Sequence, residues 1–149
     1  MAATIVCFGE LLLRMSASDN QRLMQLPSLN VHVGGAEANV AISLAQFGHT
    51  SRMVSSLPEN PLADAVIRDL RSHDVQTNSI QRREGRVGLY FLETGAVQRP
   101  SRITYDRAGS SFVETPAATY DWLTLLEDAD WLHISGITPA TGPDAAGAA

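Results

Sequence analysis

The hydrophobic positions in the first part of the chain follow two different periods. Residues 4–8 form a short apolar run rich in β-branched side chains, and 51–56 form a second short run, so each predicts a strand. Between them, residues 36–47 carry apolar side chains at helical spacing, and Gly48 follows as a helix-ending glycine. A second helical pattern covers 61–72 and starts with a proline, which is favoured at the first helical position.

The alternation of strands and helices continues and is then interrupted. A strand expected around Val75 completes a β-α-β-α-β order, which is typical of a parallel sheet covered by helices. Residues 87–94 and 102–107 then predict two strands with no helix between them, as in a hairpin or a small separate sheet. A helix over 120–129 and a strand over 131–134 return to the first rhythm.

Composition and charge exclude several classes of function. The chain has 149 residues and a net charge of -5, and we expect it to bind no nucleic acid and to lie in the cytoplasm, since no apolar run is long enough for a membrane span. All 11 basic residues are arginine, so no lysine is present for a Walker motif or a Schiff base. The single cysteine, Cys7, permits no internal disulfide. The four histidines are dispersed, so we expect no metal site.

Two adjacent glycines, Gly34 and Gly35, lie between a predicted strand and a predicted helix. Such a turn lets the backbone approach a ligand closely, and its free N–H groups attract oxygen-rich or anionic groups. A tight turn in which Glu37 merely complements the helix dipole explains the pattern equally well. A dinucleotide site is excluded because the next glycine after Gly35 is Gly48.

The segment GGAEANVAISLAQFG, which starts at Gly34, resembles the first signature of the ribokinase-like (PfkB) sugar kinases. In that family two glycines and an asparagine, here Gly34, Gly35 and Asn39, touch the sugar hydroxyls. The segments VGLYFLE, TYDRAGS and LHISGIT further resemble the 2-keto-3-deoxygluconate kinases. The resemblance implies a ribokinase-like α/β fold, with a mostly parallel sheet flanked by helices and a small β lid formed by about 11–33 and 87–107.

The matched residues suit an acidic sugar. Alternation along a strand places Ile103, Tyr105 and Arg107 on one face, where a phenol and a guanidinium fit a ligand with hydroxyls at one end and a carboxylate at the other. The resemblance implies that Tyr105 and Arg107 contact the substrate, that Tyr90 contributes from the preceding lid strand, and that Ile137 lies against the sugar. Without the resemblance, Tyr90 reads as sheet packing and Arg107 as half of a surface ion pair.

Glu10 follows Gly9 at the end of the first predicted strand. Ligands bind at the carboxyl ends of strands in α/β proteins, so its carboxylate either faces the pocket or lies solvated in a loop.

The resemblance also defines what we expect to be missing. In the family a Gly-Ala-Gly-Asp segment supplies the catalytic base and an anion hole, and this sequence contains none. The end, TGPDAAGAA, resembles a first helical turn, so we interpret 1–149 as the N-terminal half of one ribokinase-like domain whose nucleotide-binding half is absent. We expect no catalytic residue in this chain, no nucleotide bound and no turnover by this chain alone.

The expected activity is therefore that of the full-length enzyme: phosphorylation of 2-keto-3-deoxygluconate to its 6-phosphate with ATP and Mg²⁺. A homo-oligomer through the β lid is expected as well. Two alternatives remain open, namely a fructokinase or ribokinase type of sugar kinase, and a non-catalytic assembly module.

Overall fold

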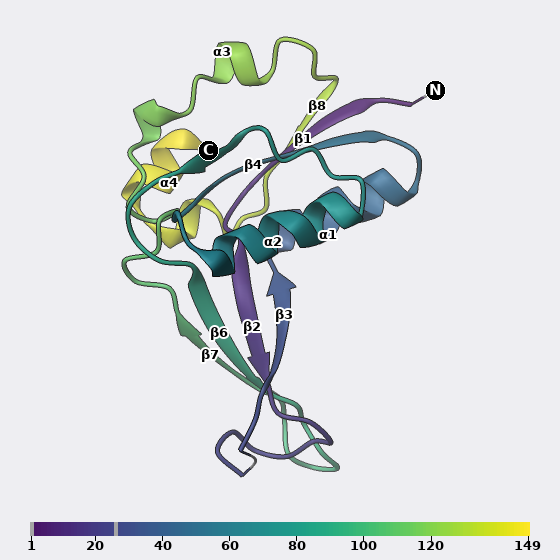
Figure 1. The fold of residues 1–149 in the computed structure, drawn as a ribbon, viewed down its shortest axis with the longest axis vertical. Helices are drawn as coiled ribbons and strands as arrows, with labels where there is room; N and C mark the ends of the chain where they lie inside the picture. Colours follow the sequence, from purple (N-terminus) through teal and green to yellow (C-terminus); the bar gives the residue numbers. More distant parts are fainter. Residues whose placement is uncertain (1, 26) are drawn as a thin grey trace.

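The structure is a computed structural model that describes residues 2–25 and 27–149. Within these residues the strands form two four-stranded sheets (Figure 1). The first sheet has the order β5-β4-β1-β8, and all of its pairs are parallel. Its strands are β1 (Thr4–Phe8), β4 (Thr50–Leu57), β5 (Ile80–Arg82) and β8 (Trp131–His133). The expected mixed α/β fold with a parallel sheet flanked by helices is confirmed.

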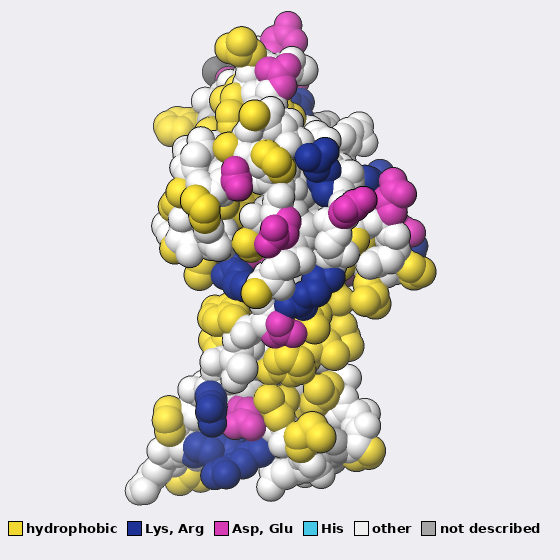
Figure 2. All heavy atoms as spheres, turned by 90° about the vertical axis from the view of Figure 1, so that its left-hand side faces the viewer, with side chains coloured by type: hydrophobic (Ala, Val, Ile, Leu, Met, Phe, Trp, Pro, Cys, Tyr) yellow, Lys and Arg dark blue, Asp and Glu magenta, His cyan; other side chains and the backbone are white. Residues whose placement is uncertain are grey.

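The second sheet has the order β3-β2-β6-β7 and is called the lid sheet below. Its strands are β2 (Leu12–Ser16), β3 (Asn30–Gly34), β6 (Gly88–Glu93) and β7 (Arg102–Asp106). Strands β2 and β6 pair in parallel, and each has an antiparallel outer neighbour. The two segments expected to form a lid, 11–33 and 87–107, therefore supply these strands. The lid sheet extends away from the helices in Figure 1, and Figure 2 shows hydrophobic side chains exposed on this lower part of the molecule.

Helices cover both faces of the parallel sheet. Alternation along β1 sends Ile5 and Cys7 to one hydrophobic cluster and Val6 and Phe8 to another. The first cluster packs against α1 (Ala36–Gln46) and α2 (Pro61–Ser72). The second packs against the C-terminal elements η1 (Ala117–Thr119), α3 (Trp122–Leu125) and α4 (Pro143–Ala148), and η2 (Pro139–Thr141) lies just before α4. Cys7 is fully buried in the first cluster.

Local signals set the ends of the two long helices. At the C-terminal end of α1, Gly48 adopts a φ of 84° and donates its N–H to the carbonyl of Ala45. A glycine in this left-handed conformation ends a helix at little cost, as the sequence predicted. At the start of α2, the Asn60 side chain accepts a hydrogen bond from the N–H of Ala63 at 2.9 Å, and Pro61 occupies the first helical position.

Two predicted elements differ from the structure. The strand expected around Val75 is wrong in position, because a left-handed residue, Asp74 (φ 62°), turns the chain there and only Gln76 forms an isolated bridge. The third parallel strand is β5, which lies further along the chain. The helix expected over 120–129 is limited to α3, which Asp121 caps at its start by accepting the N–H of Thr124.

None of the helices in 2–25 and 27–149 is long and apolar enough to cross a membrane, and the expected cytoplasmic location stays a prediction.

Candidate functional site

A cavity of about 120 Å³ lies where the lid sheet meets the carboxyl ends of β1 and β8 and the start of α1. The predicted residues Gly35, Asn39, Tyr90, Tyr105, Arg107 and Ile137 all line it. Gly34, the remaining predicted residue, ends β3 directly beside it. The sequence left the place of Glu10 open, and it did not point to the other lining residues, namely Leu12, Ala36, Glu37 and Thr138. The structure thus brings the predicted set together, while its role in binding remains a prediction.

The two glycines make room for other parts of the protein. A Cβ added to Gly34 would lie 2.9 Å from Cε1 of Tyr90, so the bare backbone admits the tyrosine ring. Gly35 has a φ of 147°, and a Cβ there would lie 2.7 Å from the carbonyl oxygen of Glu10. A side chain at Gly34 would displace the ring, and one at Gly35 would displace the backbone. The glycines therefore shape the cavity by letting its walls approach each other.

Aromatic rings and a cation form the lid side of the cavity. Tyr90 on β6 and Tyr105 on β7 are directly paired across the strands, and their ring centroids lie 5.8 Å apart. The Arg107 guanidinium lies 5.6 Å from the centroid of the Tyr105 ring. Tyr105 is 51% exposed, so its ring is available to a ligand at the mouth of the cavity. This wall presents hydroxyl groups and a positive charge side by side.

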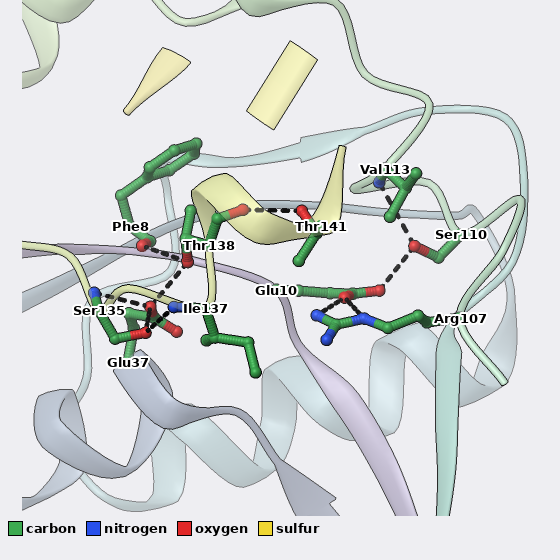
Figure 3. A network of polar contacts seen from close by, with 10 residues as sticks. All are labelled: Phe8, Glu10, Glu37, Arg107, Ser110, Val113, Ser135, Ile137, Thr138 and Thr141. Carbon is green, nitrogen blue, oxygen red and sulfur yellow. Dashed lines mark hydrogen bonds and ion pairs between the residues drawn. The ribbon is translucent and has the colours of Figure 1, made fainter. Parts of the chain in front are cut away.

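The carboxylate of Glu10 anchors Arg107 from inside the protein (Figure 3). Arg107 donates to Oε2 of Glu10 from both Nε, at 2.6 Å, and Nη2. Oε1 of the same carboxylate accepts the hydroxyl of Ser110 at 2.6 Å. Glu10 is therefore a buried residue of the cavity, which decides against the solvated loop acid.

The alternative interpretation of Arg107, as half of a surface ion pair, does not hold, because its partner is the buried Glu10. Its chain neighbour, Asp106, forms an exposed ion pair with Arg86 instead. The only sequence signal that placed Glu10 near a pocket was its position after Gly9, at the carboxyl end of β1.

A second buried carboxylate ties the loop after β8 to the start of α1. Oε1 of Glu37 accepts hydrogen bonds from Ser135 N at 3.0 Å, Ser135 Oγ at 2.5 Å and Thr138 Oγ1 at 2.7 Å (Figure 3). Burial acts to raise the pKa of Glu37, but these hydrogen bonds outweigh it and hold the pKa below its ordinary value. The network fixes the loop that carries Ile137, whose side chain is 42% exposed at the cavity. Glu37 therefore does more than complement the helix dipole.

In the described part of the chain, no group of three or more His, Cys, Asp and Glu side chains is placed to hold a metal ion. The cavity combines one buried ion pair, two phenols, an amide side chain and the start of a helix. Groups of these kinds are able to form hydrogen bonds with hydroxyls and with a carboxylate.

Known proteins resemble this chain in sequence and in structure. The sequence matches the pfkB family carbohydrate kinase description over residues 2–149. It is 36% identical over 140 residues to a protein of Haloferax volcanii named 2-dehydro-3-deoxygalactonokinase, and this match covers 94% of the chain but 44% of the relative.

Two crystal structures of sugar kinases also resemble this chain. A 2-dehydro-3-deoxygluconokinase from Thermotoga maritima matches with a TM-score of 0.91 and 48% identity, covering 94% of this chain and 43% of the other. A fructokinase from Xylella fastidiosa with bound ATP matches with a TM-score of 0.74 and 25% identity, covering 89% of this chain and 39% of the other. The chain thus spans less than half the length of these relatives. Since the family match extends over nearly every residue, the chain belongs to the pfkB family of carbohydrate kinases.

Proposed function

We propose that the protein that carries this chain phosphorylates 2-keto-3-deoxygluconate, also called 2-dehydro-3-deoxygluconate, to its 6-phosphate with ATP as donor. The observation that carries the proposal is the wall formed by Tyr90, Tyr105 and Arg107 on one cavity. A neutral sugar needs no cation, whereas a sugar acid needs one within reach of its hydroxyl-binding groups. The names of the Haloferax and Thermotoga relatives support the same substrate class.

Within this proposal the chain supplies recognition of the acceptor sugar. Arg107 binds the carboxylate, and Asn39 together with the two tyrosines binds hydroxyl groups, because each side chain has donors or acceptors at the cavity. Ile137 packs against the carbon skeleton. Closure of the lid sheet over the sugar would exclude water from the reacting hydroxyl.

ATP is proposed as the donor because the Xylella fructokinase was solved with it, and Mg²⁺ accompanies ATP in phosphoryl transfer. The residues described here do not form a metal cluster, and the sequence has neither a lysine nor the Gly-Ala-Gly-Asp segment. In this proposal none of the described residues contacts the nucleotide, and none acts as the catalytic base.

A fructokinase or ribokinase type of activity is the second candidate. One observation favours it: the charge of Arg107 is already paired with Glu10, and a neutral sugar would leave that pair undisturbed. The Xylella fructokinase shows that the fold also carries kinases named for a neutral sugar.

We also propose that the protein forms a homo-oligomer through the lid sheet. Two strands of this sheet expose apolar side chains, since Val31 on β3 is 53% exposed and Ile103 on β7 is 51% exposed. Both strands are edges of the sheet and offer unpaired backbone groups to a second copy. Sedimentation velocity of the protein and of an Ile103→Asp variant tests this, because a lid interface predicts that the variant dissociates.

The substrate assignment is tested by comparing an acid with a neutral sugar. Binding of ketodeoxygluconate and of fructose is measured by isothermal titration calorimetry on the wild type and on Arg107→Ala. The proposal predicts that Arg107→Ala loses about tenfold or more in affinity for the acid, as expected for a lost charged hydrogen bond, and little for any neutral sugar bound. Equal losses for both sugars would favour the neutral-sugar kinase. An absence of binding by either sugar would favour an assembly module.

A further inference from the structure

We propose that Glu10 is a positioning residue that orients the Arg107 guanidinium for the carboxylate of an acidic sugar and so sets the preference for sugar acids. This inference rests on the proposed function. Nothing in the resemblance to sugar kinases assigned a role to Glu10, and it follows from the contacts of its carboxylate.

The Glu10 side chain is held in place by its surroundings. Its side chain is 2% exposed, and Ser110 holds Oε1 while Arg107 holds Oε2. The backbone also restrains it, because the carbonyl oxygen of Glu10 lies against the bare Cα of Gly35. A buried carboxylate needs such partners, since an unpaired buried charge is strongly destabilising. The position of Glu10 is therefore set by the fold and not by a ligand.

Glu10 determines which edge of the Arg107 guanidinium remains free. Arginine carries five N–H donors in a planar fork, and Glu10 takes one from Nε and one from Nη2. The Cζ of Arg107 lies over the Tyr105 ring, 5.6 Å from the ring centroid. Among the described residues, the Nη1 donors of Arg107 have no protein acceptor, and Figure 3 shows this nitrogen pointing away from Glu10. With the Nε–Nη2 edge taken by Glu10, the Nη1–Nη2 edge remains, and it can bind a second carboxylate bidentately.

Glu10 affects the binding of an acid at Arg107 in two ways that have opposite signs. Its negative charge lowers the positive potential at Arg107, so Coulomb's law alone predicts that removal of this charge tightens binding of an acid. Its hydrogen bonds hold a long, flexible side chain in one rotamer, so positioning predicts that their loss weakens binding of the acid. The direction of the change in Glu10→Gln therefore decides between the two.

A matched control lies on the same hairpin. Asp106 precedes Arg107 and pairs with Arg86, and the side chains of Arg86 and Asp106 are 36% and 54% exposed. Asp106→Asn removes a carboxylate at almost the same place in the chain without touching the cavity lining. It reports what the loss of one negative charge does to the affinity by long-range electrostatics alone.

The experiment is a double-mutant cycle measured by isothermal titration calorimetry with ketodeoxygluconate and with fructose. The proteins are the wild type, Glu10→Gln, Arg107→Ala, the double variant and Asp106→Asn, with near-ultraviolet circular dichroism as the check on folding. If Glu10 positions Arg107, Glu10→Gln should lower the affinity for ketodeoxygluconate about tenfold or more. The double variant should then show no further loss of affinity relative to Arg107→Ala. Asp106→Asn is expected to bind as the wild type does.

Tighter or unchanged binding of the acid by Glu10→Gln overturns the inference, as do losses that add in the double variant. If the wild type binds no sugar acid, the proposed function fails instead, so the two failures are distinguishable. If Glu10→Gln does not fold, Ser110→Ala replaces it, because this variant leaves the Glu10 carboxylate in place and removes its hydrogen bond at Oε1, together with a longer bond of 3.3 Å that Ser110 Oγ accepts from the N–H of Val113. A selective loss for the acid in Ser110→Ala then supports the inference, and unchanged affinity overturns it.

Discussion

Replacement of Gly34 by alanine separates a binding effect from a folding effect. The backbone at Gly34 belongs to β3 and pairs with Leu12, and its φ lies outside the left-handed region, so alanine fits the backbone itself. The added Cβ would, however, lie 2.9 Å from Cε1 and 3.1 Å from the hydroxyl oxygen of Tyr90. The strain therefore falls on the Tyr90 ring, which is a wall of the cavity.

The size of the effect follows from that contact. Carbon atoms reach ordinary contact at about 3.5 Å, so Tyr90 has to retreat by roughly 0.6 Å or more. Overpacking of this kind costs about 1–3 kcal/mol. If the displaced ring carries this cost when the sugar binds, the affinity falls by roughly 5- to 150-fold.

The assay measures binding and stability on the same samples. Gly34→Ala is titrated with ketodeoxygluconate by calorimetry, and its thermal unfolding is compared with that of the wild type. The matched control is Gly136→Ala, since no atom lies within 4 Å of a Cβ added there. Wild-type affinity in Gly34→Ala would mean that the Tyr90 ring has room to move or takes no part in binding, contrary to this prediction.

Three further predictions concern the groups around the site. Gly35→Ala should destabilise the fold by about 1–3 kcal/mol, because its φ of 147° is strained for alanine and its Cβ would meet backbone, and an unchanged urea midpoint would contradict this. The lowered pKa of Glu37 means that its contribution to stability is complete above the ordinary value of 4.5 and is lost as the pH falls below it. From neutral pH to about pH 3.5, the free energy of unfolding of Glu37→Gln should therefore fall by less than that of the wild type, as measured by urea titration. Equal falls in both proteins would show that protonation of Glu37 does not cause the loss. Burial raises the pKa of Cys7 to about 12, so a thiol reagent should modify it only on unfolding, and rapid labelling of the native chain would contradict the packing of β1.

The local part of the fold could be predicted from the sequence because each signal lies within a few residues. The end of α1 at Gly48 and the start of α2 at Pro61 depend on residues next to the boundary. The same holds for Tyr105 and Arg107, since alternation along one strand places both on one face, and both line the cavity. The prediction of a strand near Val75 was wrong because apolar character alone does not fix where the chain turns.

The polar supports of the site could not be predicted in this way. Arg107 meets Glu10 across 97 positions of sequence, and Glu37 meets Ser135 across 98. No local period links such distant residues, so the position of Glu10 at a strand end suggested a pocket but could not identify its partner. The roles of Gly34 and Gly35 show the same limit, because what fills the space above them is Tyr90 and the backbone of Glu10.

We propose above that one cavity between Gly35 and Tyr105 binds an acidic sugar through Arg107. A crystal structure of the protein with ketodeoxygluconate tests it most directly. We expect the sugar to lie between Gly35 and Tyr105 with its carboxylate on the free edge of the Arg107 guanidinium. A sugar bound elsewhere, or one in this cavity with its carboxylate turned away from Arg107, would contradict it.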